Sequence, residues 1–334
     1  MDKIYLKNYN TFGLNVVADS LINISSEDHL LDVLKENSHK PTLILGGGSN
    51  ILFTKNVKTL ILKNEIKGLN IFHENDDKTV TIRVGGGEVW HEIVLHCIGR
   101  SWGGIENLSL IPGTVGAAPI QNIGAYGVEL KEVFYALDAI NLETFEKKTF
   151  YKDECEFGYR ESVFKKELKG KYFITHVYLT LQKQPILKTH YGDIQAELAK
   201  LPYTNYTIRD VSNAVIAIRS SKLPNPAEIG NAGSFFKNPS IPTAQFEELK
   251  MRYPEMPAYP LDAQKVKIPA AWLIQQQGWK GKRFGNFGVH EKQALVLVNY
   301  GGANGQDILE LSEKIIDSVK SNFGIELERE VNIL

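Results

Sequence analysis

Ser234 is the strongest candidate for a catalytic side chain, because of the residues that flank it in the sequence. It lies in the run 230–239, Gly-Asn-Ala-Gly-Ser-Phe-Phe-Lys-Asn-Pro, where two glycines permit a tight turn and a close backbone approach. Such a turn would present the serine hydroxyl into a cleft, where it could donate a proton. Gly-Ser turns also occur in loops without chemistry, so the run alone leaves both interpretations open.

A glycine-rich loop directly after a strand suggests that the chain also binds an anion. Residues 46–50 are Gly-Gly-Gly-Ser-Asn and follow the apolar segment 42–45. No Gly-Lys-Ser/Thr follows, which excludes a Walker loop. The third glycine of the Rossmann motif Gly-x-Gly-x-x-Gly is absent, and a strand is expected after the loop where that motif has a helix, so a Rossmann fingerprint is excluded as well. Consecutive backbone N–H groups can still form a concave phosphate site. A simple glycine turn is the alternative.

A second loop, residues 111–127, is a long stretch of small residues with few charges. Small residues let the backbone pack closely against a flat or extended ligand, whereas a core would want larger side chains. An irregular buried linker is the alternative. Together, the two glycine loops and Ser234 predict a cofactor that faces a proton donor.

Hydrophobic patterning predicts the elements that position these loops. The first part is expected to hold strands at 16–18, 22–24, 42–45, 51–53 and 59–62, and a helix that Ser25 or Ser26 caps and that ends at Asn37. The middle part is expected to hold strands at 79–84, 135–141 and 172–181 and helices at 88–98 and within 202–213. The last part is expected to hold helices at 269–277 and 306–322 and strands at 294–298 and 325–333.

Composition bounds the class of protein. The 334 residues suffice for two or three domains, and the net charge of −1 gives no bulk attraction to nucleic acid or anionic membrane. The two cysteines, Cys97 and Cys155, predict a reducing compartment without a disulfide framework. No apolar run reaches the roughly 18 residues of a membrane span, and the start has no signal-peptide core, so a cytoplasmic protein is expected. The histidines have no metal-ligand spacing, and no metal is expected.

Four motifs, in this order, closely resemble the UDP-N-acetylenolpyruvoylglucosamine reductase family, flavoenzymes of peptidoglycan precursor synthesis. They are the loops 46–50 and 111–127, the segment 159–165 (Tyr-Arg-Glu-Ser-Val-Phe-Lys) and the run 230–239. The resemblance extends from Asn10 to Glu330. The segment 190–193, His-Tyr-Gly-Asp, is similar to the tyrosine loop that closes over the substrate in the longer, type I branch.

This resemblance implies an α+β fold that binds FAD without a Rossmann sheet, as vanillyl-alcohol-oxidase-like proteins do. Two α+β FAD-binding subdomains, 1–67 and 68–219, are expected beside a smaller α+β substrate domain, 220–324. The strand 325–334 is a candidate to return to the first subdomain. The FAD contacts carried over are Gly46, Gly47, Gly48, Ser49, Asn50, Ile111, Pro112, Gly113, Thr114, Gly116, Ala117, Ala118, Gly124, Tyr126 and Gly127.

The resemblance also implies the reaction. NADPH reduces the flavin, and the enol ether of UDP-N-acetylglucosamine enolpyruvate then takes a hydride on its β-carbon, which gives UDP-N-acetylmuramate. Ser234 matches the donor of the proton to the α-carbon, and Arg160 and Glu330 match the pair that stabilises the enolate-like state. Whether Glu330 is protonated, or holds a water or Arg160, stays open. The substrate contacts carried over are Tyr191, Arg219, Lys222, Asn238, Lys280 and Gln293.

Some features stand apart from the family or allow other functions. Arg329 lies where the family often has proline, and Asn332 where it often has arginine, which bears on the geometry around Glu330. Outside the motif context, Arg160 would be a surface arginine and Glu330 the solvated face of a strand. A flavin oxidase on the same cofactor fold and a colourless nucleotide-sugar binding protein are the rival functions. A monomer is expected.

Overall fold

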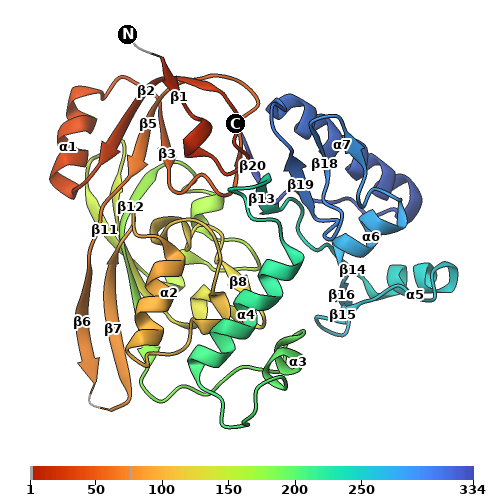
Figure 1. The fold of residues 1–334 in the computed structure, drawn as a ribbon. Coiled ribbons are helices and arrows are strands. Elements are labelled where there is room, and N and C mark those ends of the chain that lie inside the picture. The colour runs from red at the N-terminus through yellow and green to blue at the C-terminus, as the bar shows by residue number, and fades with distance from the viewer. Residues whose placement is uncertain (1–2, 76) are drawn as a thin grey trace. The chain divides into compact units, whose positions relative to one another are not determined.

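The structure is a computed structural model that describes residues 3–75 and 77–334 (Figure 1). The chain divides into two compact units, each interleaved in sequence with the other. Unit 1 comprises the chain through Ile4, 18–47 and 58–221, and unit 2 comprises 5–17, 48–57 and 222–334. Residues 1–2, with which the first predicted subdomain begins, lie outside the described part. The predicted domain limits stay a prediction.

Two sheets dominate unit 1. The larger has the order β11-β10-β12-β7-β6, and all its neighbouring strands are antiparallel. The smaller has the order β1-β2-β5-β3, in which β3 and β5 are parallel. The strands are β1 (Ile4–Tyr5), β2 (Val17–Ile24), β3 (Thr42–Leu45), β5 (Val57–Asn64), β6 (Leu69–Asn75), β7 (Thr79–Gly85), β10 (Phe134–Asn141), β11 (Lys147–Tyr151) and β12 (Tyr172–Gln182), with a short hairpin β8 (Gly124–Ala125) and β9 (Val128–Glu129).

Two helices of unit 1 pack on these sheets, and two further helices form a smaller cluster. In α1 (Glu27–Glu36), the Ser26 side chain accepts the backbone N–H of His29, which caps the helix as predicted. Helix α2 (Trp90–Gly99) buries its apolar side against β7, β10 and β12 in one core cluster. The short α3 (Ile194–Leu198) and α4 (Ile208–Lys222) share a smaller cluster.

Unit 2 is built around helix α7 (Gly305–Phe323), whose predicted apolar residues are all buried. Asn304 caps its start, and Gly324, with φ of 65°, ends it. The helix packs with α6 (Ala270–Gln276) and the sheet β13-β19-β18-β17 in one core (Figure 1). Further elements are β4 (Ile51–Leu52), β13 (Gly230–Ser234), β14 (Ser240–Pro242), α5 (Thr243–Arg252), β15 (Tyr259–Pro260), β16 (Lys265–Lys267), β17 (Arg283–Phe284), β18 (Phe287–Val289), β19 (Val296–Asn299) and β20 (Asn332–Ile333). Short 3₁₀ turns join elements in both units, at 7–9, 106–108, 115–117, 130–132, 152–155 and 163–165.

Three predictions about elements need correction. The helix placed within 202–213 begins at Ile208 and continues to Lys222, because Thr207 and Asp210 form reciprocal capping hydrogen bonds at its start. The strand predicted at 325–333 is regular only at Asn332–Ile333, although Ile325, Leu327 and Val331 are buried as the alternation required. The segments predicted at 16–18 and 22–24 are one strand, β2. None of the described helices is long and apolar enough to cross a membrane.

Candidate active site

The glycines of the first loop are required by close backbone approaches. In unit 1, a Cβ on Gly46 would lie 2.7 Å from Oγ1 of Thr114, and one on Gly47 would lie 2.9 Å from Cα of Gly113. In unit 2, Gly48 has φ of 65°, and its Cβ would lie 2.0 Å from the carbonyl oxygen of Tyr9. Real Cβ atoms do not come this close, so any other residue would push the loop apart.

The second loop is held by the first turn of α2 and by the glycine turn before it. Val115 donates its N–H to the carbonyl of Glu88 at 2.9 Å, and Gly116 donates to Gly86 at 2.8 Å. From the helix side, Trp90 donates to the carbonyl of Gly113 at 3.0 Å. The loop is therefore irregular but held by hydrogen bonds, and the residue before it, Leu110, is in the left-handed conformation with φ of 59°.

These loops fit a dinucleotide cofactor. Gly46 and Gly47 lie against Gly113 and Thr114, so two of the predicted FAD segments meet backbone to backbone in unit 1. The Oγ1 atom of Thr114 is buried and, among the described residues, has no hydrogen-bond partner. An unpaired buried hydroxyl between glycine turns is the donor that a diphosphate would use.

Arg160 lies beside the turn that carries Tyr126 and Gly127. Its guanidinium donates to the carbonyl oxygen of Gly124, and a Cβ on Gly124 would lie 2.8 Å from its Nη1. Arg160 has φ of 56° and Tyr126 has φ of 49°, so both adopt left-handed backbone conformations that non-glycine residues rarely take. Such strain is often found at functional sites, because the surrounding structure must enforce it.

Two further predicted substrate residues gather near the same turn of unit 1. The Nε of Arg219 is buried and, among the described residues, has no hydrogen-bond partner. Burial lowers the pKa of Arg219, and the charge of Arg160 lowers it further. The ring of Tyr191 packs edge-to-face on Tyr126, with 6.5 Å between centroids. Two arginine side chains near one tyrosine pair provide a positive site for an anionic ligand.

In unit 2, Ser234 ends strand β13 at a built turn. Gly233 has φ of 70°, and its N–H donates to Oδ1 of Asn231 at 2.9 Å. A Cβ on Gly230 would lie 2.1 Å from the carbonyl oxygen of Phe12, so this position must also be glycine. Ser234 is half-buried and stands opposite Val296 of β19. The run therefore forms the tight turn that its glycines predicted, and the role of Ser234 as a proton donor stays a prediction.

The chain brings Glu330 to the same place. The Glu330 N–H donates to the carbonyl of Phe235 at 2.8 Å, directly after Ser234. Asn50 donates through Nδ2 to the carbonyl of Glu330 at 3.2 Å, and Asn332 donates through Nδ2 to the carbonyl of Asn50 at 3.0 Å. Glu330 is half-buried, not on a solvated strand face. Asn332, which departs from the family pattern, thus supports the backbone that holds Glu330.

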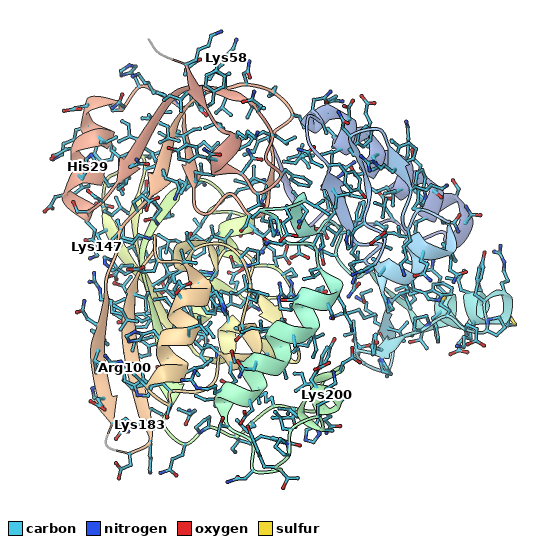
Figure 2. The ribbon with its side chains drawn as sticks, viewed as in Figure 1. His29, Lys58, Arg100, Lys147, Lys183 and Lys200 are labelled. Atoms are coloured by element: carbon cyan, nitrogen blue, oxygen red, sulfur yellow. The ribbon has the colours of Figure 1, made fainter. Side chains whose placement is uncertain are left out.

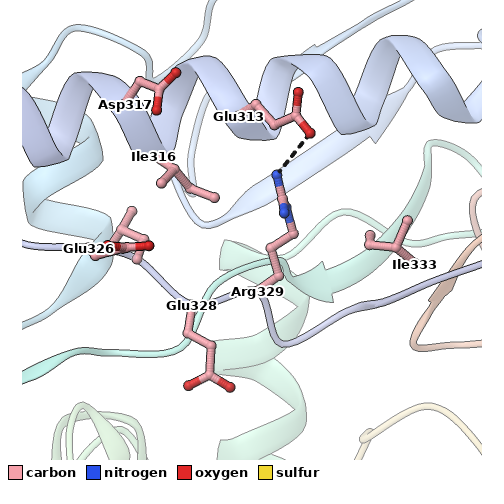
Figure 3. Close-up of a pocket in the computed structure, with 8 residues that line it drawn as sticks. Glu313, Ile316, Asp317, Glu326, Glu328, Arg329 and Ile333 are labelled. Carbon is pink, nitrogen blue, oxygen red and sulfur yellow. Dashed lines mark ion pairs between the residues drawn. The ribbon is translucent and has the colours of Figure 1, made fainter.

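The side chain of Arg329, next to Glu330 in the chain, contacts helix α7. Its Nε donates to Oγ of Ser312 at 2.8 Å, and its guanidinium pairs with Glu313 at 3.6 Å (Figure 3). Arg329 also lines a pocket of about 730 Å³ between α7 and the C-terminal segment. The other polar residues that line it are acidic: Glu313, Asp317, Glu326 and Glu328. Of the predicted site residues, none is among those that line this pocket, and its negative charge does not suit an anionic substrate.

The remaining predicted substrate residues lie in unit 2, in separate local settings. Oδ1 of Asn238 accepts the N–H of Ala270 at the start of α6, so a substrate contact would use its Nδ2. Gln293 belongs to the turn before β19 and accepts from Leu295 at 3.4 Å. Lys280 and Lys222 are exposed.

A charged cluster on unit 1 involves none of the predicted site residues. Glu27, Asp138 and His176 lie close enough to resemble a metal site. Lys147 approaches Glu27 at 2.9 Å and Asp138 at 3.4 Å, and Arg83 pairs with both carboxylates (Figure 2 labels Lys147). Two cations already neutralise the acids, so this cluster is an ion-pair network.

The cysteines are not suited to nucleophilic chemistry. Cys97 and Cys155 are both buried and free. Burial raises the pKa of each thiol to about 12, so both stay protonated at neutral pH.

The motifs did not indicate two polar residues next to the predicted loops. Asn107 is fully buried and donates through Nδ2 to the carbonyls of Tyr126 and Lys188, each at 2.9 Å. His91 accepts the N–H of Leu110. The only sequence signal for a role of Asn107 was its position as a polar residue just before the second loop. No sequence signal indicated a role of His91, because its hydrogen-bond partner Leu110 lies 19 positions away.

Comparisons with known proteins agree with this picture. Residues 18–141 match an FAD binding domain, and residues 225–334 match the UDP-N-acetylenolpyruvoylglucosamine reductase C-terminal domain. The UDP-N-acetylenolpyruvoylglucosamine reductase of Flavobacterium johnsoniae is 52% identical, with 98% of each chain covered, and that of Bacteroides fragilis is 46% identical, with 99% of each covered.

Among solved structures, the enzyme of this name from Thermus caldophilus shares the fold. The TM-score is 0.68 at 22% identity, over 99% of this chain and 98% of that one. The predicted α+β fold that binds FAD without a Rossmann sheet is thereby confirmed. At the identities given above, over nearly the full length, the chain belongs to the UDP-N-acetylenolpyruvoylglucosamine reductase family.

Proposed function

We propose that this protein reduces UDP-N-acetylglucosamine enolpyruvate to UDP-N-acetylmuramate with NADPH. The observation that carries the proposal is the hydrogen bond from the Glu330 N–H to the carbonyl of Phe235, which ties the backbone of Glu330 to the residue that follows Ser234. A serine and a glutamate held by neighbouring backbone segments would suit a step that needs a proton and charge stabilisation. Family membership supports the substrate, and the FAD-binding domain supports the cofactor.

The cofactor would be held by backbone groups. Gly46, Gly47 and the segment 111–118 would bind its diphosphate, with Oγ1 of Thr114 as a side-chain donor. Bound FAD would supply the redox chemistry, taking a hydride from NADPH and giving it to the β-carbon of the enol ether. The chain's own task is then to bind, orient and protonate the substrate.

Three side chains would stabilise or neutralise the negative charge that hydride addition creates next to the substrate carboxylate. Arg160 would stabilise the enolate-like oxygens with its forked donors. Ser234 would give its Oγ proton to the α-carbon and regain a proton from water, so that the enol ether gains one hydride and one proton. Glu330 would stabilise the same state. Tyr191, Arg219, Lys222, Asn238, Lys280 and Gln293 would bind the sugar nucleotide.

The test separates the two half-reactions. The protein is purified anaerobically, its flavin is reduced with NADPH, and UDP-N-acetylglucosamine enolpyruvate is added. Return of the yellow oxidised flavin together with the lactyl product is expected. A reduced flavin that ignores this substrate but reacts rapidly with oxygen would replace the reductase by an oxidase, and a colourless protein would mean a binding function without turnover.

A further inference from the structure

His91 lies in the first turn of α2 and reaches the residue that precedes the second glycine loop. Its Nδ1 is 2.9 Å from the backbone nitrogen of Leu110. A backbone N–H can only donate, so Nδ1 must accept, and the ring must be neutral with its proton on Nε2. The hydrogen bond therefore exists in only one protonation state of the histidine.

Leu110 is a residue that needs such support. Its φ of 59° is left-handed, which is costly for a branched non-glycine side chain. The residue after it, Ile111, opens the segment 111–118. The same turn of α2 holds the chain on both sides of Leu110, since Trp90 donates through Nε1 to the carbonyl of Leu108 and through its backbone N–H to that of Gly113, each at 3.0 Å.

We propose that His91 is a positioning residue of the cofactor site, which fixes segment 111–118 in its FAD-binding conformation by accepting the N–H of Leu110. This inference rests on the proposed assignment of that segment to FAD. Without an acceptor, Leu110 would keep a partly buried, unpaired N–H and would relax to a right-handed conformation. The loop would then lose the arrangement in which Gly113 and Thr114 lie against Gly46 and Gly47.

The surroundings of His91 keep the acceptor available at neutral pH. Burial lowers the pKa of His91, and the nearby cation of Arg219 lowers it further, against an opposing effect of Glu92. When the ring is protonated, Nδ1 becomes a donor that faces another donor, and the hydrogen bond is lost. Because the pKa lies below its ordinary value, the bond persists until the pH falls below that lowered pKa. FAD affinity is then expected to fall.

The test measures FAD affinity directly. The flavin is removed, and the full-length protein is titrated with FAD, followed by flavin fluorescence and the visible spectrum. His91→Leu is expected to raise the dissociation constant about tenfold, because it leaves a partly buried N–H unpaired and frees the strained backbone of Leu110. His91→Asn, whose Oδ1 can occupy the place of Nδ1, is expected to stay within about threefold of the unmodified protein and to lose the acid decline in affinity.

His96→Leu is the matched control. His96 lies on the same helix and is exposed, and its Nε2 accepts from Nε of Arg100, at the far end of the helix from the loop (Figure 2 labels Arg100). Its FAD affinity should not change. Equal affinity of His91→Leu and the unmodified protein would overturn the proposal, as would a folded His91→Asn variant that binds as weakly as His91→Leu.

Gly47→Val separates this inference from the cofactor assignment beneath it. Its side chain would meet Gly113, so FAD binding should be lost if these loops hold the cofactor. Loss in Gly47→Val with normal binding in His91→Leu would reject only the role of His91. Normal binding in both would reject the loop assignment itself. If His91→Leu does not fold, the acid decline in the unmodified protein and its absence in His91→Asn decide the question.

Discussion

Glu330 is tied by its backbone to the residue that follows Ser234: its N–H donates to the carbonyl oxygen of Phe235 at 2.8 Å. Next to this contact, Phe236 and Arg329 form an isolated antiparallel bridge, and Lys237 donates to Glu328 at 2.9 Å. Residues almost a hundred positions apart thus form a short ladder. The backbones of the serine and the glutamate are therefore held by one hydrogen-bonded arrangement.

Ser234→Ala tests the proposed proton donor. Reduction of the flavin by NADPH should stay near the unmodified rate, because this half-reaction needs no proton for the substrate carbon. Reoxidation by the enolpyruvyl sugar nucleotide should slow roughly 10²- to 10⁴-fold, the usual contribution of a general acid. Stopped-flow absorbance of the flavin measures both rates. Ser240→Ala, at an exposed serine of the same unit, is the control, and equal losses in both half-reactions of Ser234→Ala would contradict the assignment.

The parts of the fold that could be predicted are those that local interactions determine. The Ser26 cap of α1 and the apolar stripe of α7 depend on neighbours within a few residues, and both are as predicted. The start of α4 was wrong although its signal is local, because the capping pair Thr207 and Asp210 was not recognised.

Long-range relationships could not be read from the sequence. Strand β4, at 51–52, pairs in parallel with β20, at 332–333, and no sequence pattern in either segment indicates which strand it pairs with. The glycines located the loops in the sequence. The left-handed conformations of Leu110, Tyr126 and Arg160 could not be predicted, because these residue types rarely adopt them. Arg160 and Glu330 came from the family motifs alone, because neither has a local pattern that distinguishes it from a surface residue.

Asn107→Ala tests whether the cofactor loop and the substrate tyrosine are held together. Asn107 donates to the carbonyl of Tyr126 and to that of Lys188, three positions before Tyr191. Loss of both hydrogen bonds should loosen the placement of Tyr191 over Tyr126, and KM for the sugar nucleotide should rise about tenfold. The rate of flavin reduction by NADPH should change little. A fall in kcat at unchanged KM would contradict this role.

Glu27→Gln tests the ion-pair network of unit 1 through the pH dependence of stability. The hydrogen bond from His176 holds the pKa of Glu27 well below its ordinary value, with Lys147 and Thr175 acting in the same direction against burial. A depressed pKa contributes stability above the pKa of the unfolded chain, about 4.3, and this contribution is lost as the pH falls toward the folded value.

The substitution should therefore lower the free energy of unfolding at pH 7 by about 1–3 kcal/mol, because Lys147 loses its charged partner and the amide offers one accepting oxygen in place of two. The difference from the unmodified protein should shrink as the pH falls below about 4. Urea unfolding at several pH values measures it. Asp28→Asn, an exposed acid in the same helical turn, is the control, and a difference that does not vary with pH would contradict the network.

Arg219→Met connects the substrate site with the proposed role of His91. The Nε of Arg219 is buried and has no hydrogen-bond partner among the described residues, so the substitution takes away a cation that the anionic substrate would use. KM for the sugar nucleotide should rise at least tenfold, and kcat should change less. The same cation lowers the pKa of His91, so its removal should raise that pKa.

The acid decline of FAD affinity should then begin at a higher pH in Arg219→Met than in the unmodified protein, because His91 gains its proton sooner. FAD titrations across the pH range measure this shift. Arg209→Met, an exposed arginine on the same helix, should leave both the decline and KM unchanged. If KM rises in Arg219→Met but the acid decline of FAD affinity begins at the same pH as in the unmodified protein, Arg219 contributes to substrate binding and not to the protonation of His91.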